Sequence, residues 1–286
     1  MWVADKWNDY RLIDTSNGEK LEKWGKYTLV RPDPQVIWQS KKEHYAWKNA
    51  DASYKRIGGG GSWNINSLPE SWTITYGDLV FKISPSGFKH TGLFPEQAAN
   101  WDWFGNLRRE AKRPIKVLNL FAYTGGATVA AAKAGASVVH VDSSKGMVGR
   151  AKENAQLSGV GDAPIRYIVD DCKKFVEREI RRGNKYDAVI MDPPSYGRGP
   201  NGEVWKLEDN IDALVDIVSK ILSDKPLFFL LNSYTTGLSP LAMKYIVELR
   251  LPDQNRKIEA EELGLLTEVG EHVLPCGSSV RVTYNY

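Results

Sequence analysis

Three short motifs in this 286-residue chain can carry chemistry: a glycine-ended turn, an aspartate after a buried strand, and an aspartate followed by two prolines. The turn is Ala-Tyr-Thr-Gly-Gly at 122–126, and it follows the apolar run 117–121, which predicts a buried strand. After it, an alanine-rich segment that Gly135 can end predicts a helix. Small residues after a strand let a ligand approach the backbone, and the helix offers unpaired N–H groups. This order is typical of a nucleotide-cofactor site.

Asp142 ends the next predicted strand, about 20 residues after the turn, where nucleotide-binding folds place a carboxylate that accepts ribose hydroxyls. The turn lacks the G-x-G-x-x-G spacing that lets a pyrophosphate lie on bare backbone, and it contains the bulky Tyr123. The residues therefore disfavour a dinucleotide. They fit S-adenosylmethionine, which has an amino-acid tail, a sulfonium and an adenosine but no phosphate. The alternative is a parallel α/β domain in which the glycines only cap helices.

Asp192, Pro193 and Pro194 follow a third apolar run, 186–191. Proline cannot continue a central strand, so the chain must leave the sheet here, at the carboxyl edge where α/β folds bind ligands. The proline carbonyls and Asp192 can accept a hydrogen bond from a substrate N–H group and direct its nitrogen towards a methyl donor. Alone, the triplet is about as often a plain strand-ending turn. Its place one strand–helix unit after Asp170-Asp171 favours a function.

In combination, these motifs resemble the class I S-adenosylmethionine-dependent methyltransferases, and more narrowly the group that holds large-subunit ribosomal RNA methyltransferases. The resemblance covers about residues 88–286, and the motifs that carry it are 119–126, 141–144, Asn154, Asp170-Asp171 and 192–196. The stretch 91–97 is also similar to that group, although Lys more often stands where this chain has His90, and Asp where it has Glu96.

The resemblance implies a role for each residue of the motifs. It places the methionine tail against the turn, the ribose against Asp142, and the adenine edge against Asp171 and the Cys172 backbone. The residues expected to bind the cofactor are Phe121, Ala122, Tyr123, Thr124, Gly125, Gly126, Asp142, Ser143, Ser144, Asp171 and Cys172. Those expected on the acceptor side, as the catalytic set, are Asp192, Pro193, Pro194, Tyr196 and Asn232. In amino-methyltransferases an aromatic residue often follows the prolines directly, whereas here Ser195 intervenes.

The acceptor atom is predicted from the cysteines. Some relatives methylate carbon 5 of cytosine, which requires a thiolate that attacks the ring. This chain has two cysteines, Cys172 and Cys276, and neither lies in the loops that follow 186–191 and 227–231. We therefore expect a nitrogen or oxygen acceptor. The four histidines show no ligand spacing, so no metal site is expected.

The basic and aromatic residues of the front part favour RNA, and ribosomal RNA through the resemblance, as partner. A formal charge of +3 does not require a nucleic acid, but residues 1–113 carry 17 basic and 13 acidic side chains and nine of the ten tryptophans. Aromatic faces beside cations suit single-stranded nucleic acid, whereas a small β domain can equally use indoles as its core. The alternatives are methylation of a small molecule or a protein, and a non-catalytic RNA-binding protein that retains the pocket.

Composition also predicts the compartment. No run of about 18 apolar residues suggests a membrane span. Residues 1–6 lack the apolar core of a secretory signal, and two cysteines suggest a reducing compartment. A cytoplasmic location is expected.

The predicted fold is α/β, with a doubly wound, mostly parallel seven-stranded sheet of the Rossmann-like methyltransferase type and a small N-terminal β-rich domain. The expected domains are a β-rich module at 1–57, a glycine linker with a hairpin and a bridging helix at 58–113, and a cofactor-binding catalytic domain at 114–286. In the catalytic domain, strands and helices alternate, Ser143 is expected to cap a helix, and a closing antiparallel pair comprises 258–269 and 280–284.

In the front part, strands at 9–14 and 26–31 are predicted around the turn signal Asn17-Gly18, and a hairpin is predicted at 72–83. The quartet Gly58–Gly61 is either a flexible joint or a lid, and a joint is favoured because nothing beside it is catalytic. Residues 195–205 are expected to be a loop in which Arg198 can contact phosphate or remain solvated.

Overall fold

The computed structural model describes residues 1–57, 60–85, 89–198, 204–253 and 255–285. The chain divides into two compact units. The first unit comprises Met1–Ala99 with Leu263–Cys276, and the second comprises Asn100–Glu262 with Gly277–Tyr286. Among the described residues, no helix is long and apolar enough to cross a membrane.

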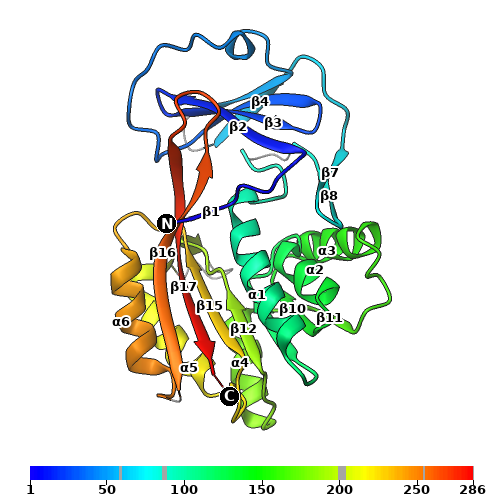
Figure 1. Cartoon of the computed structure of the whole chain (residues 1–286), viewed down its shortest axis with the longest axis vertical. Helices are drawn as coiled ribbons and strands as arrows, with labels where there is room; N and C mark the ends of the chain where they lie inside the picture. Colours follow the sequence, from blue (N-terminus) through cyan, green and yellow to red (C-terminus); the bar gives the residue numbers. More distant parts are fainter. Residues whose placement is uncertain (58–59, 86–88, 199–203, 254, 286) are drawn as a thin grey trace. The chain divides into compact units, whose positions relative to one another are not determined.

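The second unit contains the predicted α/β sheet (Figure 1). Its strands lie in the order β16-β17-β15-β12-β9-β10-β11. Their bounds are β9 Lys116–Leu120, β10 Ser137–Asp142, β11 Ile165–Val169, β12 Ala188–Met191, β15 Phe228–Ser233, β16 Arg256–Leu266 and β17 Val273–Tyr284. The five strands from β15 to β11 are parallel, and β17 pairs antiparallel with β15. A further strand, β1 (Trp2–Val3), pairs in parallel with the end of β16 that belongs to the first unit.

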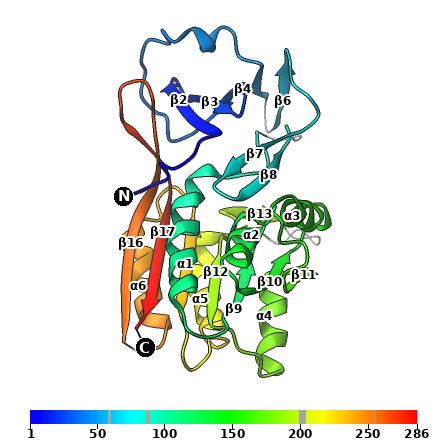
Figure 2. The same cartoon turned by 45° about the vertical axis from the view of Figure 1, so that its right-hand side comes forward.

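Helices cover both faces of this sheet (Figure 2). They are α1 Ala98–Glu110, α2 Gly126–Lys133, α3 Lys145–Leu157, α4 Cys172–Arg181, α5 Leu207–Ser219 and α6 Pro240–Arg250. On one face, apolar residues of α4, α5 and α6 pack on alternate strand residues such as Val189 and Leu231. On the other face, Phe104 of α1 stacks on Phe228 of β15 with ring centroids 5.6 Å apart. The alternation of strands and helices predicted for residues 114–286 is confirmed.

Two details of the second unit differ from the prediction. The cap of α3 is Ser144, whose side chain accepts from the Met147 N–H, and not Ser143. The predicted loop 195–205 contains a small hairpin, β13 Tyr196–Arg198 paired with β14 Val204–Lys206. The two alternatives for Arg198, a phosphate contact or a solvated side chain, are not tested, because its side chain lies outside the described part of the structure.

The first unit is a β structure with more strands than the sequence predicted. Its main sheet has the order β2-β3-β4-β5-β6, and the predicted hairpin β7 Trp72–Tyr76 with β8 Leu79–Ile83 is confirmed. The sheet's strands are β2 Tyr10–Ser16, β3 Glu19–Trp24, β4 Tyr27–Pro32, β5 Ala52–Ile57 and β6 Gly60–Ile65. The turn Asn17-Gly18 joins β2 to β3. The sequence did not predict β3, because four of its residues are charged.

The glycine quartet is not a joint at Gly60 and Gly61, because both lie in β6 and pair with β5. A Cβ added to Gly61 would lie 2.4 Å from the Lys55 carbonyl oxygen and 2.7 Å from the Tyr54 ring. Glycine is required there by this close approach, not by flexibility. Gly58 and Gly59 lie outside the described residues.

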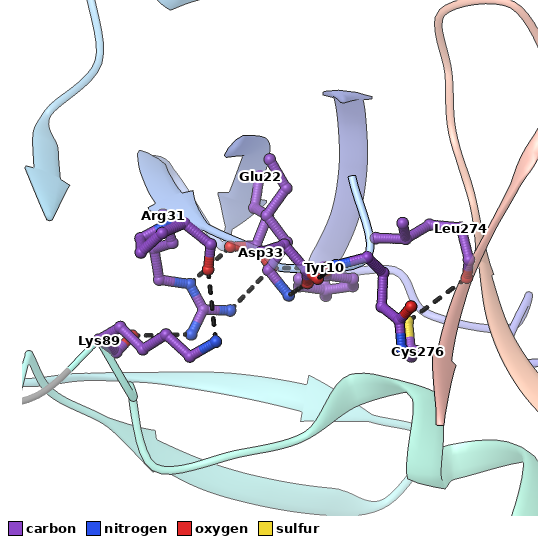
Figure 3. Close-up of polar contacts among 10 residues, drawn as sticks. Tyr10, Glu22, Arg31, Asp33, Lys89, Leu274 and Cys276 are labelled. Atoms are coloured by element: carbon purple, nitrogen blue, oxygen red, sulfur yellow. Dashed lines mark hydrogen bonds and ion pairs between the residues drawn. The ribbon is translucent and has the colours of Figure 1, made fainter. Parts of the chain in front are cut away.

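Charged residues of β3 and β4 are buried in the first unit and bonded to one another (Figure 3). Arg31 donates through Nε and Nη2 to the two carboxylate oxygens of Glu22, at 2.6 and 2.8 Å, and the Tyr10 hydroxyl donates to Glu22 at 2.8 Å. Lys20 Nζ forms ion pairs with Glu22 Oε1 at 3.6 Å and with Asp33 Oδ2 at 3.2 Å. We call these five residues the Arg31 cluster. Burial alone would raise the pKa of Glu22, but Arg31 and Lys20 lower it to about 2.

Five tryptophans of the first unit serve its structure. Trp24 is fully buried. The indole N–H groups of four others donate to oxygens within the unit: Trp7 to Pro95, Trp38 to Thr15, Trp47 to Asp14 and Trp72 to Trp24. Trp24 is therefore a core residue, and the other four, which are half-buried, have their indole N–H groups bonded within the unit.

Candidate active site

The turn after β9 has an unusual backbone that neighbouring elements hold in place. Phe121 and Tyr123 both have positive φ, 55° and 49°, which is costly for residues with side chains. The Phe121 N–H donates to the Cys172 Sγ at 3.2 Å, the Ala122 N–H to the Val141 carbonyl at 3.1 Å, and the Tyr123 N–H to Asp142 Oδ2 at 2.8 Å. Strained backbone that the surroundings enforce in this way is typical of ligand-binding sites.

The start of α2 offers donors to a ligand. Gly125 is its N-cap with φ 82° and has no side chain to bond the first N–H groups, which therefore remain available to an anion. A Cβ at Gly125 would lie 2.8 Å from the Ala151 Cβ, so this position requires glycine. The buried Thr124 is fixed through its carbonyl, which accepts from the Asn154 side chain at 2.9 Å. Gly126 is the first residue of α2.

Asp142 has acceptor capacity left after its internal bonds. It is half-buried at the end of β10, with Oδ2 bonded to the Tyr123 N–H and Oδ1 to the Ser144 N–H at 2.8 Å. Each carboxylate oxygen has another lone pair, so two hydroxyls can still be accepted. Ser144 is committed to capping α3, and Ser143 is exposed beside Asp142.

Asp171 and Cys172 follow β11. Asp171 is exposed, and its Oδ1 caps α4 by accepting from the Lys174 N–H at 2.8 Å, which leaves Oδ2 for a ligand. The Cys172 side chain is buried beneath the turn. Burial, together with the charges of Asp142 and Asp171, raises the pKa of this thiol to about 12 despite its bond from the Phe121 N–H. Cys172 is a neutral thiol that positions the turn.

The acceptor-side motif follows β12. Asp192 is half-buried, Pro193 is buried and Pro194 is exposed. The Pro194 carbonyl accepts from the Trp205 indole N–H at 2.7 Å, so this carbonyl already has an internal partner. Tyr196 is 53% exposed at the start of β13.

Asn232 lies at the carboxyl end of β15, one residue after Leu231, which pairs with Met191 of β12. It is buried, and its Oδ1 accepts from Asn100 Nδ2 at 3.1 Å and from Ser279 Oγ at 2.5 Å. Sequence reasoning missed Asn100 and Ser279, since they come from α1 and β17 and no local pattern connects them to Asn232.

The candidate site thus lies along one edge of the sheet, because neighbouring parallel strands end on the same side. The ends of β9, β10 and β11 carry the residues expected to bind the cofactor. The ends of β12 and β15 carry those expected on the acceptor side. This edge combines uncapped helix N–H groups for a carboxylate, lone pairs for hydroxyls, and a free carboxylate oxygen for an N–H donor. An amino acid joined to a nucleoside matches that combination.

Comparison with known proteins gives an independent assignment. The family described as S-adenosylmethionine-dependent methyltransferase matches residues 53–210. A putative ribosomal RNA large subunit methyltransferase of Methanocaldococcus jannaschii is 32% identical over 199 residues, 68% of this chain and 49% of that protein. The ribosomal RNA large subunit methyltransferase K/L of Shewanella sediminis is 34% identical over 192 residues, 67% of this chain and 24% of that protein. The chain therefore spans half or less of the length of these relatives.

Solved structures cover more of the chain. The crystal structure of an S-adenosylmethionine-dependent methyltransferase from Agrobacterium tumefaciens has a TM-score of 0.93 and 39% identity, covering 99% of this chain and 93% of that one. A putative methyltransferase crystallised in complex with SAH has a TM-score of 0.76 and covers 98% of this chain and 76% of that one. At 18% identity, the second likeness concerns the fold.

Proposed function

The chain belongs to the S-adenosylmethionine-dependent methyltransferases, and from this premise we propose that it methylates RNA, with ribosomal RNA as the favoured substrate, at a nitrogen or oxygen atom. The methyl donor is S-adenosylmethionine. The single observation that carries the proposed site is the constrained turn between β9 and α2, whose N–H groups are bonded to Cys172 and Asp142.

The residues of the turn fit this cofactor. In the proposal, residues 121–126 and the first N–H groups of α2 bind the methionine tail, Asp142 accepts the ribose hydroxyls, and Asp171 accepts from the adenine amino group. Bound there, the cofactor would supply a sulfonium methyl group: a lone pair of the acceptor would attack the methyl carbon while the C–S bond breaks and the neutral thioether leaves. Asp192 and Pro193 orient the acceptor, and Tyr196 remains a candidate for contact with it.

The state of the cysteines supports a nitrogen or oxygen acceptor. A thiolate route to carbon methylation needs a cysteine with a low pKa beside the acceptor. The pKa of the Cys172 thiol is raised to about 12, mainly by burial, and burial also raises the pKa of Cys276 well above its usual value. Neither residue follows β12 or β15. We therefore propose that neither cysteine attacks the acceptor, which favours nitrogen or oxygen as the methylated atom.

Support for RNA comes from what the relatives' names say of them and from exposed residues of the first unit. Lys48, Lys55 and Arg56 are exposed, as are the apolar or aromatic Tyr45 and Ile57. Cations beside flat or apolar side chains suit a single strand, which is bound through its phosphates and bases. The tryptophans bonded within the unit do not contribute to this support.

Two measurements test the proposal. Calorimetric titration with S-adenosylmethionine tests the cofactor site, and the absence of binding would leave only a scaffold role. Incubation with tritiated cofactor and unmodified large-subunit ribosomal RNA, followed by digestion to nucleosides, identifies the acceptor.

The alternative of a small molecule or protein substrate is distinguished by salt. Phosphate contacts release counterions, so RNA affinity in a filter-binding assay should fall steeply between 50 and 200 mM salt, by roughly tenfold or more. The triple variant of Lys48, Lys55 and Arg56 to alanine should reduce the salt slope. A salt-independent affinity would favour the alternative.

A further inference from the structure

Arg281 lies in the interior of the second unit and can only donate hydrogen bonds. It is 7% exposed, and its guanidinium lies 5.2 Å from the centre of the Trp103 ring. Burial lowers its pKa to about 10, against the opposing effect of the Glu259 and Asp102 carboxylates, so Arg281 stays charged at neutral pH. Because a guanidinium has no acceptor atom, whatever bonds to its N–H groups must be an acceptor.

A series of hydrogen bonds connects Arg281 through Asn100 to Asn232 at the end of β15, and the direction of the first bond determines the direction of the next. Arg281 Nε donates to Asn100 Oδ1 at 2.8 Å, which fixes the Asn100 amide with Nδ2 on the other side. Asn100 Nδ2 then donates to Ser279 Oγ at 3.0 Å and to Asn232 Oδ1 at 3.1 Å. The shape of an amide does not distinguish its oxygen from its nitrogen. Here Arg281, which can only donate, must face the oxygen of Asn100, so Asn100 turns its nitrogen towards the oxygen of Asn232. We call these four residues the Arg281 chain.

Asn232 is therefore left with a donor to offer. Its Oδ1 already accepts two bonds, so the two N–H groups on Nδ2 are what remains. Within the part of the chain that the structure describes, Nδ2 donates to no other group, and it is not one of the polar atoms buried without a partner. An almost fully buried side chain thus keeps an amide nitrogen in reach of a ligand.

The place of Asn232 along the sheet indicates which ligand it meets. Leu231 pairs with Met191, so Asn232 adjoins Asp192 at the carboxyl edge. In the order β15-β12-β9-β10-β11, β15 lies on the side of β12 that faces away from the strands carrying the cofactor residues. Asn232 is consequently on the acceptor side.

We propose that the Asn232 side-chain N–H₂ group donates a hydrogen bond to the methyl-accepting substrate, and that Arg281, Asn100 and Ser279 are positioning residues that keep it in the donating orientation. The inference rests on the proposed function and narrows its substrate. Beside its nucleophilic atom, the substrate presents a hydrogen-bond acceptor such as a carbonyl oxygen or an unprotonated ring nitrogen of a base. A substrate that presents an N–H group to Asn232 is disfavoured, because two hydrogen-bond donors would then face each other.

The direct test is Asn232→Asp. The carboxylate keeps an acceptor towards Asn100 and Ser279 but replaces the N–H₂ group with an oxygen. With tritiated cofactor and an unmodified large-subunit ribosomal RNA transcript, we expect kcat to fall by about 100-fold, since a polar group of the substrate would face a group that cannot donate. The Kd for S-adenosylmethionine, measured by calorimetry, should stay within about threefold of the wild-type value.

A second variant, Asn100→Asp, tests the positioning without touching the substrate. An aspartate there accepts from Arg281 with one oxygen and from Asn232 Nδ2 with the other, so Asn232 turns its own oxygen outward. We expect a loss of kcat comparable to that of Asn232→Asp, together with an unfolding temperature no lower than that of the wild type, since the new carboxylate pairs with Arg281. Asn106→Asp, the same change at an exposed position of α1, is the matched control and should keep the wild-type kcat.

The outcomes separate the inference from the proposed function. Wild-type kcat in either aspartate variant overturns the inference alone. A loss of cofactor affinity in Asn232→Asp also overturns it, because the amide would then belong to the cofactor site. A wild-type protein that binds no S-adenosylmethionine, or that methylates no RNA, overturns the proposed function and the inference with it.

Discussion

Two buried arginines, one in each unit, are bonded in opposite ways. Arg31 of the first unit donates to both oxygens of the Glu22 carboxylate, whereas Arg281 of the second donates through Nε to the neutral amide of Asn100. Burial acts to lower the pKa of each. At Arg31 the charge of Glu22 outweighs burial and the pKa is raised, while at Arg281 burial prevails and the pKa falls to about 10.

This difference in bonding indicates that the Arg31 cluster stabilises the fold and that the Arg281 chain belongs to a binding site. In the Arg31 cluster, cations meet carboxylates inside the same unit, so the bonds close on one another. In the Arg281 chain, the bonds run to Asn232, whose Nδ2 donates to no described residue. Asp142 is similar, since each of its oxygens has a structural bond and a spare lone pair. Variants of the cluster should therefore change stability, and variants of the open-ended groups should change binding or turnover.

The largest effect is expected from Glu22→Gln. The amide has the shape of the carboxylate but no charge, which leaves Arg31 and Lys20 buried without their main counter-charge. Breaking a buried ion pair by removing one partner costs about 3 to 5 kcal/mol, so urea unfolding should show a loss of this size. The affinity for S-adenosylmethionine should not change while the protein is folded.

Asp216→Asn, in an exposed pair with Lys220, is the control and should cost less than about 1 kcal/mol. The double variant Glu22→Gln with Arg31→Met should recover part of the lost stability, because no unpaired guanidinium remains. If Glu22→Gln were as mild as the control, the cluster would not be a structural unit.

The same cluster predicts how stability depends on pH. The pKa of Glu22 is lowered from 4.5 to about 2 in the folded state, a difference that corresponds to about 3 kcal/mol. For a carboxyl with a lowered pKa, this contribution is fully present above pH 4.5 and is lost as the pH falls towards 2. Urea midpoints measured from pH 6 to pH 2.5 should therefore decline less in Glu22→Gln than in the wild type. Equal slopes would contradict the assignment.

The sequence predicted the second unit better than the first, for a physical reason. In the second unit, strands such as Ala188–Met191 are apolar throughout and alternate with helices, so hydrophobic pattern alone locates them. In the first unit, β3 contains Glu19, Lys20, Glu22 and Lys23, and its burial depends on partners in β2 and β4 that no local pattern reveals. Gly60 and Gly61 likewise suggest a flexible joint until their pairing with β5, and the Tyr54 ring beside Gly61, are known.

The candidate site divides in the same way. The turn, Asp142, Asp171 and Asp192 follow strands directly, so spacing locates them. Asn100, Ser279 and Arg281 lie far from Asn232 in sequence and meet it only through the packing of α1 and β17 on β15. Local pattern also could not predict that the Pro194 carbonyl is already bonded, because its partner, the Trp205 indole, lies in β14.

Asp142→Asn tests an open-ended group. The amide keeps one acceptor but loses the charge and replaces the other oxygen with a donor, so the ribose hydroxyls lose a charge-assisted partner. Such bonds are worth about 1.5 to 3 kcal/mol, which predicts a Kd for S-adenosylmethionine raised roughly tenfold to 100-fold by calorimetry. Stability should fall much less than in Glu22→Gln. Asp162→Asn, at an exposed turn of the same unit, is the matched control and should bind like the wild type.

The smallest effect is expected at a position that belongs to neither network. Gly149 lies exposed in α3, with ordinary helical φ and no atom within 4 Å of the place where a Cβ would be. Alanine there lowers the entropy of the unfolded chain and meets no obstacle, so Gly149→Ala should stabilise the protein by about 0.5 to 1 kcal/mol. Cofactor affinity and kcat should equal those of the wild type. The Gly149→Ala, Glu22→Gln and Asp142→Asn variants are measured by the same urea and calorimetry assays, so Gly149→Ala gives the baseline for the other two. A loss of stability or of affinity at Gly149 would mean that α3 responds to any change, and the separate effects expected at Glu22 and Asp142 would no longer identify two kinds of network.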